Sequence, residues 1–218
     1  MSPQTRIAVP ARLVPVALSA VLAAVLGVTG CQPATAGAAA IIGNDRLSVS
    51  TLQHDVDKLL AEGGGQGMTD GTLQRSTVER WVYAQLVDEV AAKLKVTVTD
   101  GDVAARIAEV KAQTGEDGYR QAVLSSGVPL SGASSLVRMV VQLDQIGLAL
   151  VPEDPTKDSQ ALEQERQQAV ATAVGEAAAN ASIEVNPRYG TFDAKSLSIQ
   201  TLQSGGLAAS EKTPAPKR

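Results

Sequence analysis

Residues 78–94 read VERWVYAQLVDEVAAKL, and this stretch decides the fold class. Its apolar side chains recur at every fourth position, at Val78, Val82, Leu86, Val90 and Leu94. Charged side chains occupy the other side of the same stretch. This spacing predicts an amphipathic helix that buries one face, and Asp70 or Thr72 is placed to start it.

The flanking sequence predicts further helices and two short strands. A first helix ends before Gly63, one runs from Thr99 to a turn at Gly115, and others cover about 119–126, 131–150 and 158–181. Short strands are expected over 39–42 and 182–185. Because two lone strands satisfy their backbone groups most simply by pairing, we expect a mainly α fold. It has about six helices and a short two-stranded β pairing of the domain's N- and C-terminal ends.

The composition excludes several classes of protein. The chain has 218 residues, of which 44% are apolar and 19% charged, and this is typical of a globular protein. Its formal charge of −4, without a basic stripe, argues against nucleic-acid binding. A single His excludes a zinc site with two imidazoles, and no phosphate-loop or dinucleotide motif is present. We therefore expect no metal and no cofactor.

The N-terminus has the pattern of an export signal. Arg6 and Arg12 precede the apolar residues 13–28 (LVPVALSAVLAAVLGV), which are fewer than the roughly 20 that a membrane span needs. The following residues 28–31 (VTGC) resemble the lipobox of bacterial lipoproteins, which implies a diacylglyceryl thioether on Cys31. Two acyl groups supply enough burial for stable anchoring. The expected location is the extracytoplasmic face of the cell membrane.

These patterns divide the protein into four parts. Residues 1–30 are predicted to be the lipoprotein signal peptide, and residues 31–38 a flexible tether of small side chains. The folded domain is expected to cover residues 39–192. Residues 193–218, rich in Ser, Gly, Lys and Pro, are expected to be a disordered tail.

Five segments in order resemble the SurA/PrsA class of extracytoplasmic chaperones. They are residues 40–47 (AIIGNDRL), 94–103 (LKVTVTDGDV), 119–128 (YRQAVLSSGV), the apolar helix after Pro129, and 183–190 (IEVNPRYG). The resemblance covers about residues 39–192 and implies a SurA N-terminal-like peptide-binding domain. Family members usually carry a parvulin-type prolyl isomerase domain before the closing strand, whereas here one helix fills that position.

Neither the residues nor the resemblance indicates catalysis. The only His, His54, is expected on the polar face of the first helix, without a nucleophile or metal partner in the sequence pattern. We therefore expect no catalytic residues, and we expect that the protein is not an enzyme. A prolyl isomerase is the least favoured hypothesis.

Four residues are candidates for contact with a client polypeptide. Trp81 and Tyr83 flank the apolar stripe, and Met139 and Val140 lie on the expected helix 131–150. The alternative interpretation is packing at the edge of the core for Trp81 and Tyr83, and packing in the core for Met139 and Val140. The resemblance implies a lipid-anchored chaperone, or holdase, that binds unfolded exported polypeptides. The alternative is a structural or adaptor lipoprotein that binds one defined envelope protein.

Overall fold

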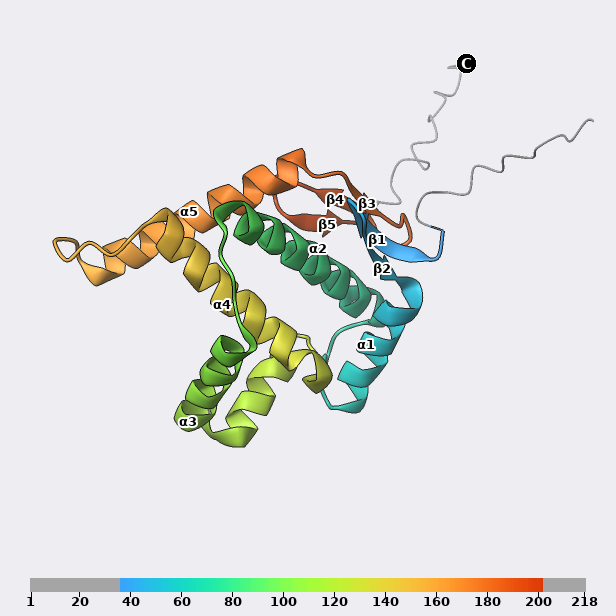
Figure 1. Cartoon of the computed structure of the whole chain (residues 1–218). Coiled ribbons are helices and arrows are strands. Elements are labelled where there is room, and N and C mark those ends of the chain that lie inside the picture. Colours follow the sequence, from blue (N-terminus) through green and yellow to red (C-terminus); the bar gives the residue numbers. More distant parts are fainter. Residues whose placement is uncertain (1–35, 202–218) are drawn as a thin grey trace, which may run out of the picture. The chain divides into compact units, whose positions relative to one another are not determined.

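The computed structural model describes residues 36–201. These residues form a mainly helical fold with two small antiparallel sheets, which confirms the expected fold class (Figure 1). The helices are α1 (Val49–Ala61), α2 (Asp70–Leu94), α3 (Asp100–Ser125), α4 (Ala133–Leu150) and α5 (Ser159–Asn180). A short 3₁₀ turn, η1 (Leu130–Gly132), precedes α4. The strands are β1 (Ala38–Ile42), β2 (Asp45–Ser48), β3 (Ile183–Val185), β4 (Thr191–Asp193) and β5 (Ser198–Gln200).

The predicted amphipathic stretch forms the C-terminal two thirds of α2. Its first four stripe residues are almost completely buried, at Val78, Val82, Leu86 and Val90. The fifth, Leu94, is exposed because it lies in the last turn. The Thr69 hydroxyl caps the N-terminus by accepting from the Thr72 backbone N–H. The other helices except α3 pack on α2, so the stripe organises the fold.

The predicted helix count of about six is not confirmed, since the described residues contain five α-helices. The difference arises at Gly115, where the sequence predicts a turn. Gly115 has φ of 76° and ψ of 172°, which are not helical, so α3 consists of two helical segments joined by a sharp kink at the predicted turn. Thr99 and Asp102 form a reciprocal capping box at its start.

The strands form more structure than the predicted two-stranded pairing. β1 pairs with β3 in antiparallel register, with Ile41 opposite Glu184, so the first and last segments of the helical domain meet. β2 pairs with the other edge of β1, and the sheet has the order β2-β1-β3. β4 and β5 form a separate hairpin with Phe192 opposite Ile199.

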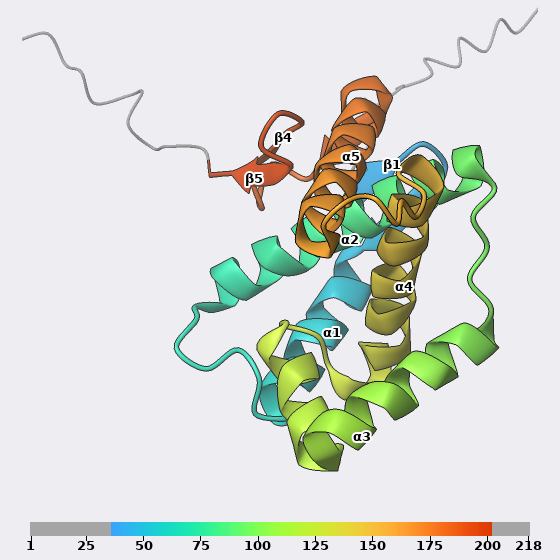
Figure 2. The same ribbon diagram turned by 90° about the vertical axis from the view of Figure 1, so that its left-hand side faces the viewer.

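The apolar interior consists of two clusters. The larger is built around α2 and includes residues of α1, α5, both sheets and the second half of α4, where Ile146 is fully buried. The smaller joins the two halves of α3 to η1 and the first half of α4, through Val103, Tyr119, Val123, Val128, Ala133 and Val137. Figure 2 shows α3 beside the N-terminal half of α4, away from the sheet. Helix α4 therefore connects the two clusters, and the junction between them positions the candidate site.

Strands lie at both ends of the predicted domain and extend past its predicted limits. β1 begins at Ala38, which belongs to the predicted tether, and the predicted end at Phe192 falls inside β4. The domain continues at least to β5, because Ile199 is 7% exposed and packs in the larger cluster. The predictions for the signal peptide, Cys31, the tether up to residue 35 and the tail from residue 202 fall outside the described residues. Within residues 36–201, none of the helices has the length and apolar character to span a membrane.

Candidate functional site

A cavity of about 310 Å³, partly open to solvent, lies at the junction of the two apolar clusters. Helix α2 forms one wall, and the residues around η1 together with the first half of α4 form the opposite wall. β2 and α1 contribute one residue each. The lining residues are Leu47, Asp55, Thr77, Arg80, Trp81, Ala84, Val128, Pro129, Ser131, Gly132, Ser135, Leu136 and Met139.

The fold brings Trp81 and Met139 to this cavity from two different helices. Both side chains are partly buried and pack against the larger cluster, so each belongs to the edge of the core and also lines the cavity. Leu136, one helical turn before Met139, extends the apolar wall. Packing against the core and contact with a client, the two roles that the sequence leaves open for Trp81 and Met139, are therefore compatible.

The other two sequence candidates lie elsewhere. Tyr83 lines a second cavity of about 520 Å³ between α4 and α5, and Val140 is 38% exposed on α4. Burial raises the pKa of the Tyr83 phenol. The four predicted residues thus do not assemble into one site.

The second cavity has a more charged lining than the first. Asp144, Glu153 and Glu163 contribute carboxylates, and Arg166 contributes a guanidinium. Arg166 is engaged in the fold, because it lies 2.9 Å from a Glu153 oxygen and donates from Nε to the Val151 carbonyl at 3.0 Å. Its contacts hold the loop between α4 and α5, so we assign this arginine a structural role.

Two charged residues of the first cavity are not among the candidates that the sequence predicts. Arg80 precedes Trp81 on α2, and Asp55 faces the same cavity from α1. Arg80 donates to the backbone carbonyl of Ser126 at 3.3 Å and to the Thr77 hydroxyl at 3.4 Å. Burial lowers the pKa of Arg80, and the negative charge of Asp55 raises it in part.

A local signal for Arg80 exists, but none exists for Asp55. Thr77, Arg80, Trp81 and Ala84 are spaced three and four apart, so they share one helix face beside the apolar stripe. The polar residues Thr77 and Arg80 on the same helix face as the lone Trp81 are the signal that could have indicated a site. Asp55 lies on another helix, and only tertiary packing places it near Arg80.

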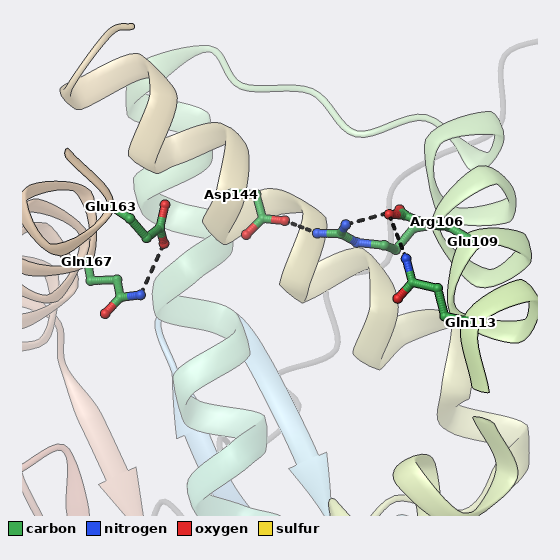
Figure 3. A network of polar contacts seen from close by, with 6 residues as sticks. All are labelled: Arg106, Glu109, Gln113, Asp144, Glu163 and Gln167. Atoms are coloured by element: carbon green, nitrogen blue, oxygen red, sulfur yellow. Dashed lines mark hydrogen bonds and ion pairs between the residues drawn. The ribbon is translucent and has the colours of Figure 1, made fainter. Parts of the chain in front are cut away.

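A polar network fixes the relative position of α3 and α4 near the first cavity. Arg106 on α3 forms an ion pair with Asp144 on α4 and another with Glu109 at 3.2 Å (Figure 3). Gln113 donates to Glu109 at 3.3 Å. Arg138 on α4 also pairs with Asp100 at the start of α3 and donates to the Val98 carbonyl at 2.6 Å. These contacts hold the α4 wall of the cavity against α3.

Within residues 36–201, no group of three His, Cys, Asp or Glu side chains is close enough to hold a metal ion. His54 is exposed on α1, as its position on the polar face of that helix predicts. What the first cavity can do chemically is bind a ligand by apolar contact and by hydrogen bonds to Arg80 and Asp55. No model of a known protein family matches this sequence, and no curated protein matches it.

Proposed function

We propose that this protein is a lipid-anchored extracytoplasmic chaperone, or holdase, that binds unfolded exported polypeptides without cofactor, ATP or prolyl isomerase activity. The observation that carries the proposal is the cavity between α2 and α4, where Trp81, Leu136 and Met139 present apolar surface at an opening to solvent. Apolar side chains are what an unfolded polypeptide exposes and a folded one buries.

A SurA N-terminal-like fold is part of this proposal. Five segments of the sequence resemble that class in the correct order. The antiparallel pairing of β1 with β3 supports the assignment, because it joins the first and fifth of these segments. The protein differs from the class by having the single helix α5 between α4 and β3.

The size of the cavity predicts weak binding. A volume of about 310 Å³ accommodates one or two client side chains. Burying one large apolar residue contributes about 1.5–3 kcal/mol, and ordering of the client opposes it. Such binding is rapidly reversible and not specific for one sequence, as a holdase requires.

The anchor places this cavity at the membrane surface, where exported polypeptides emerge. The proposed lipid on Cys31 is tested by Cys31→Ser in the full-length protein. The substitution should abolish incorporation of labelled fatty acid and release the protein from the membrane fraction. Unchanged labelling would show that Cys31 carries no lipid.

The function is tested by light scattering from a chemically unfolded client. Residues 32–218, lipid-free and in stoichiometric amounts, should suppress aggregation, whereas an unrelated acidic helical protein should not. Met139→Ala should weaken the suppression, while Leu148→Ala on the exposed part of the same helix should not. Failure to suppress the aggregation of several clients would contradict the holdase proposal.

The second candidate is an adaptor that binds one defined envelope protein. The small cavity and its charged residues Asp55 and Arg80 favour it. The large apolar side chains exposed in the described part of the protein are also spread over α1, the loop before α2, α2 and α4, at Leu60, Met68, Leu94, Val140 and Leu148. Crosslinking in the intact envelope distinguishes the two, because an adaptor gives one dominant product and a holdase gives many.

A further inference from the structure

Asp55 and Arg80 bring opposite charges to the same cavity without neutralising each other directly. Asp55 projects from α1 and Arg80 from α2, and both line the cavity beside Trp81. They attract each other electrostatically. However, the two side chains form no ion pair within residues 36–201: no nitrogen of Arg80 lies within 4.0 Å of an Asp55 oxygen.

Both groups retain hydrogen-bonding capacity. A guanidinium has five N–H donors. Arg80 uses two of them, in long bonds to the Ser126 carbonyl and the Thr77 hydroxyl. The Asp55 carboxylate, which is half-buried, accepts no hydrogen bond from any residue of the described range 36–201. A partly buried charge with unused bonding capacity is costly unless a ligand or water satisfies it.

The arrangement selects a ligand by its charge. A free anion would be attracted by Arg80 and repelled by Asp55, and a free cation would experience the reverse. A neutral ligand with one donor and one acceptor satisfies both side chains. An extended polypeptide presents such N–H and C=O groups along its backbone, together with side chains for the adjacent apolar wall.

We infer that Asp55 accepts a hydrogen bond from a backbone N–H of the bound polypeptide and Arg80 donates to one of its backbone carbonyls. Trp81, Leu136 and Met139 contact an apolar side chain of the same segment. This inference rests on the proposed function and names what the site recognises: an extended backbone that carries an apolar residue. Recognition of the backbone explains how a small cavity can bind clients of different sequence.

The test uses a peptide probe with capped ends. The probe is a nine-residue unstructured peptide of Ser and Gly with a central Leu, and a matched probe carries N-methyl groups on the Leu and on both flanking residues. The full-length protein is purified from membranes into lipid nanodiscs. Trp81 is the only Trp of the protein, so its fluorescence reports binding directly.

We expect the N-methylated peptide to bind at least about tenfold more weakly, since hydrogen bonds to charged groups are lost. Asp55→Asn and Arg80→Gln should each weaken binding of the parent peptide about tenfold. The control Asp57→Asn, on the exposed side of α1, should leave it unchanged. Thermal unfolding of each variant shows whether it is folded. Binding of the parent peptide should change little between low and moderate salt.

Three results overturn the inference. Equal affinity for the two peptides shows that the backbone is not recognised. The Asp55→Asn variant is also tested with a peptide that has a free C-terminal carboxylate. If this variant binds that peptide more tightly than the capped peptide, the site is one for an anion. Absence of binding by every peptide also overturns it. If aggregation is suppressed while N-methylation has no effect, only this inference fails. If neither clients nor peptides bind, the proposed function fails with it.

Discussion

The carboxylate of Glu62 accepts a 2.6 Å hydrogen bond from the backbone N–H of Leu130. Glu62 is the C-cap residue of α1, and Leu130 begins η1 at the wall of the first cavity. The backbone carbonyl of Glu62 also accepts from Arg120 of α3 at 3.4 Å. One residue at the end of α1 therefore holds both α3 and the turn that shapes the cavity.

Glu62→Ala should destabilise the protein by about 2 kcal/mol, because it leaves a partly buried N–H without its charged acceptor. Urea denaturation followed by circular dichroism measures the change in the free energy of unfolding. Glu176→Ala, on an exposed position of α5, is the matched control and should change it by less than about 0.5 kcal/mol. Equal effects of the two substitutions would show that the contact with Leu130 contributes nothing.

Ala84→Leu should block the first cavity while leaving the fold intact. Ala84 lines the cavity on α2, and the larger side chain would extend into the space proposed for a client. We expect client affinity to fall at least about fivefold and stability to change by less than about 1.5 kcal/mol. Ala92→Leu, on the exposed face of the same helix, controls for added hydrophobicity. Client binding that survives Ala84→Leu would place the site elsewhere.

Two Gly→Ala substitutions should change stability in opposite directions. Gly190 has φ of 127°, and a Cβ there would lie 2.3 Å from the backbone oxygen of Gln200 and 2.7 Å from Ile199 Cγ2. Gly190→Ala should therefore cost about 2–4 kcal/mol and lower the melting temperature.

Gly175 provides the control for this change. It lies within α5, and a methyl group added there would meet no atom within 4 Å, so Gly175→Ala should stabilise the protein by about 0.5–1 kcal/mol. Calorimetry on both variants measures the two shifts. A stabilising Gly190→Ala would mean that β4 and β5 do not pack as described.

Asp102 should contribute to stability at neutral pH and lose that contribution in acid. Hydrogen bonds from the hydroxyl and then the backbone N–H of Thr99, with the nearby charge of Arg138, lower the pKa of Asp102. A carboxylate whose pKa is lower in the folded state stabilises that state above its unfolded pKa. This stabilisation is lost as the pH falls through the lower, folded pKa.

Asp102→Ala should accordingly unfold at lower urea than the unsubstituted protein at pH 7. The difference between the two should shrink as the pH falls below the ordinary Asp pKa of about 4. Asp57→Ala is the control, because no residue of the described range donates a hydrogen bond to its exposed carboxylate. A difference that stays constant with pH would contradict the role of the ionised Asp102 in the cap.

Much of the helical structure could be predicted because its causes are local. The stripe from Val78 to Val90 and the cap at Thr99 depend on residues three or four positions apart. Helix α5 is predicted over about 158–181 and occupies Ser159–Asn180. The β4–β5 hairpin was missed because each of its strands has only three residues, TFD and SIQ, which is too short for an alternating pattern to stand out. It is held by the Glu79 carboxylate, which accepts from the Ile199 N–H at 2.6 Å.

The sequence by itself determined the mainly helical class, through periodic apolar residues and helix caps that act over one or two turns. It also provides the prediction of a lipid on Cys31, which depends on a short linear motif. The tertiary structure decided which side chains share a cavity. Trp81 with Met139, and Asp55 with Arg80, come from separate helices whose docking depends on the packing of two apolar clusters. Such pairs arise from contacts between residues far apart in the sequence, for which local periodicity carries no signal.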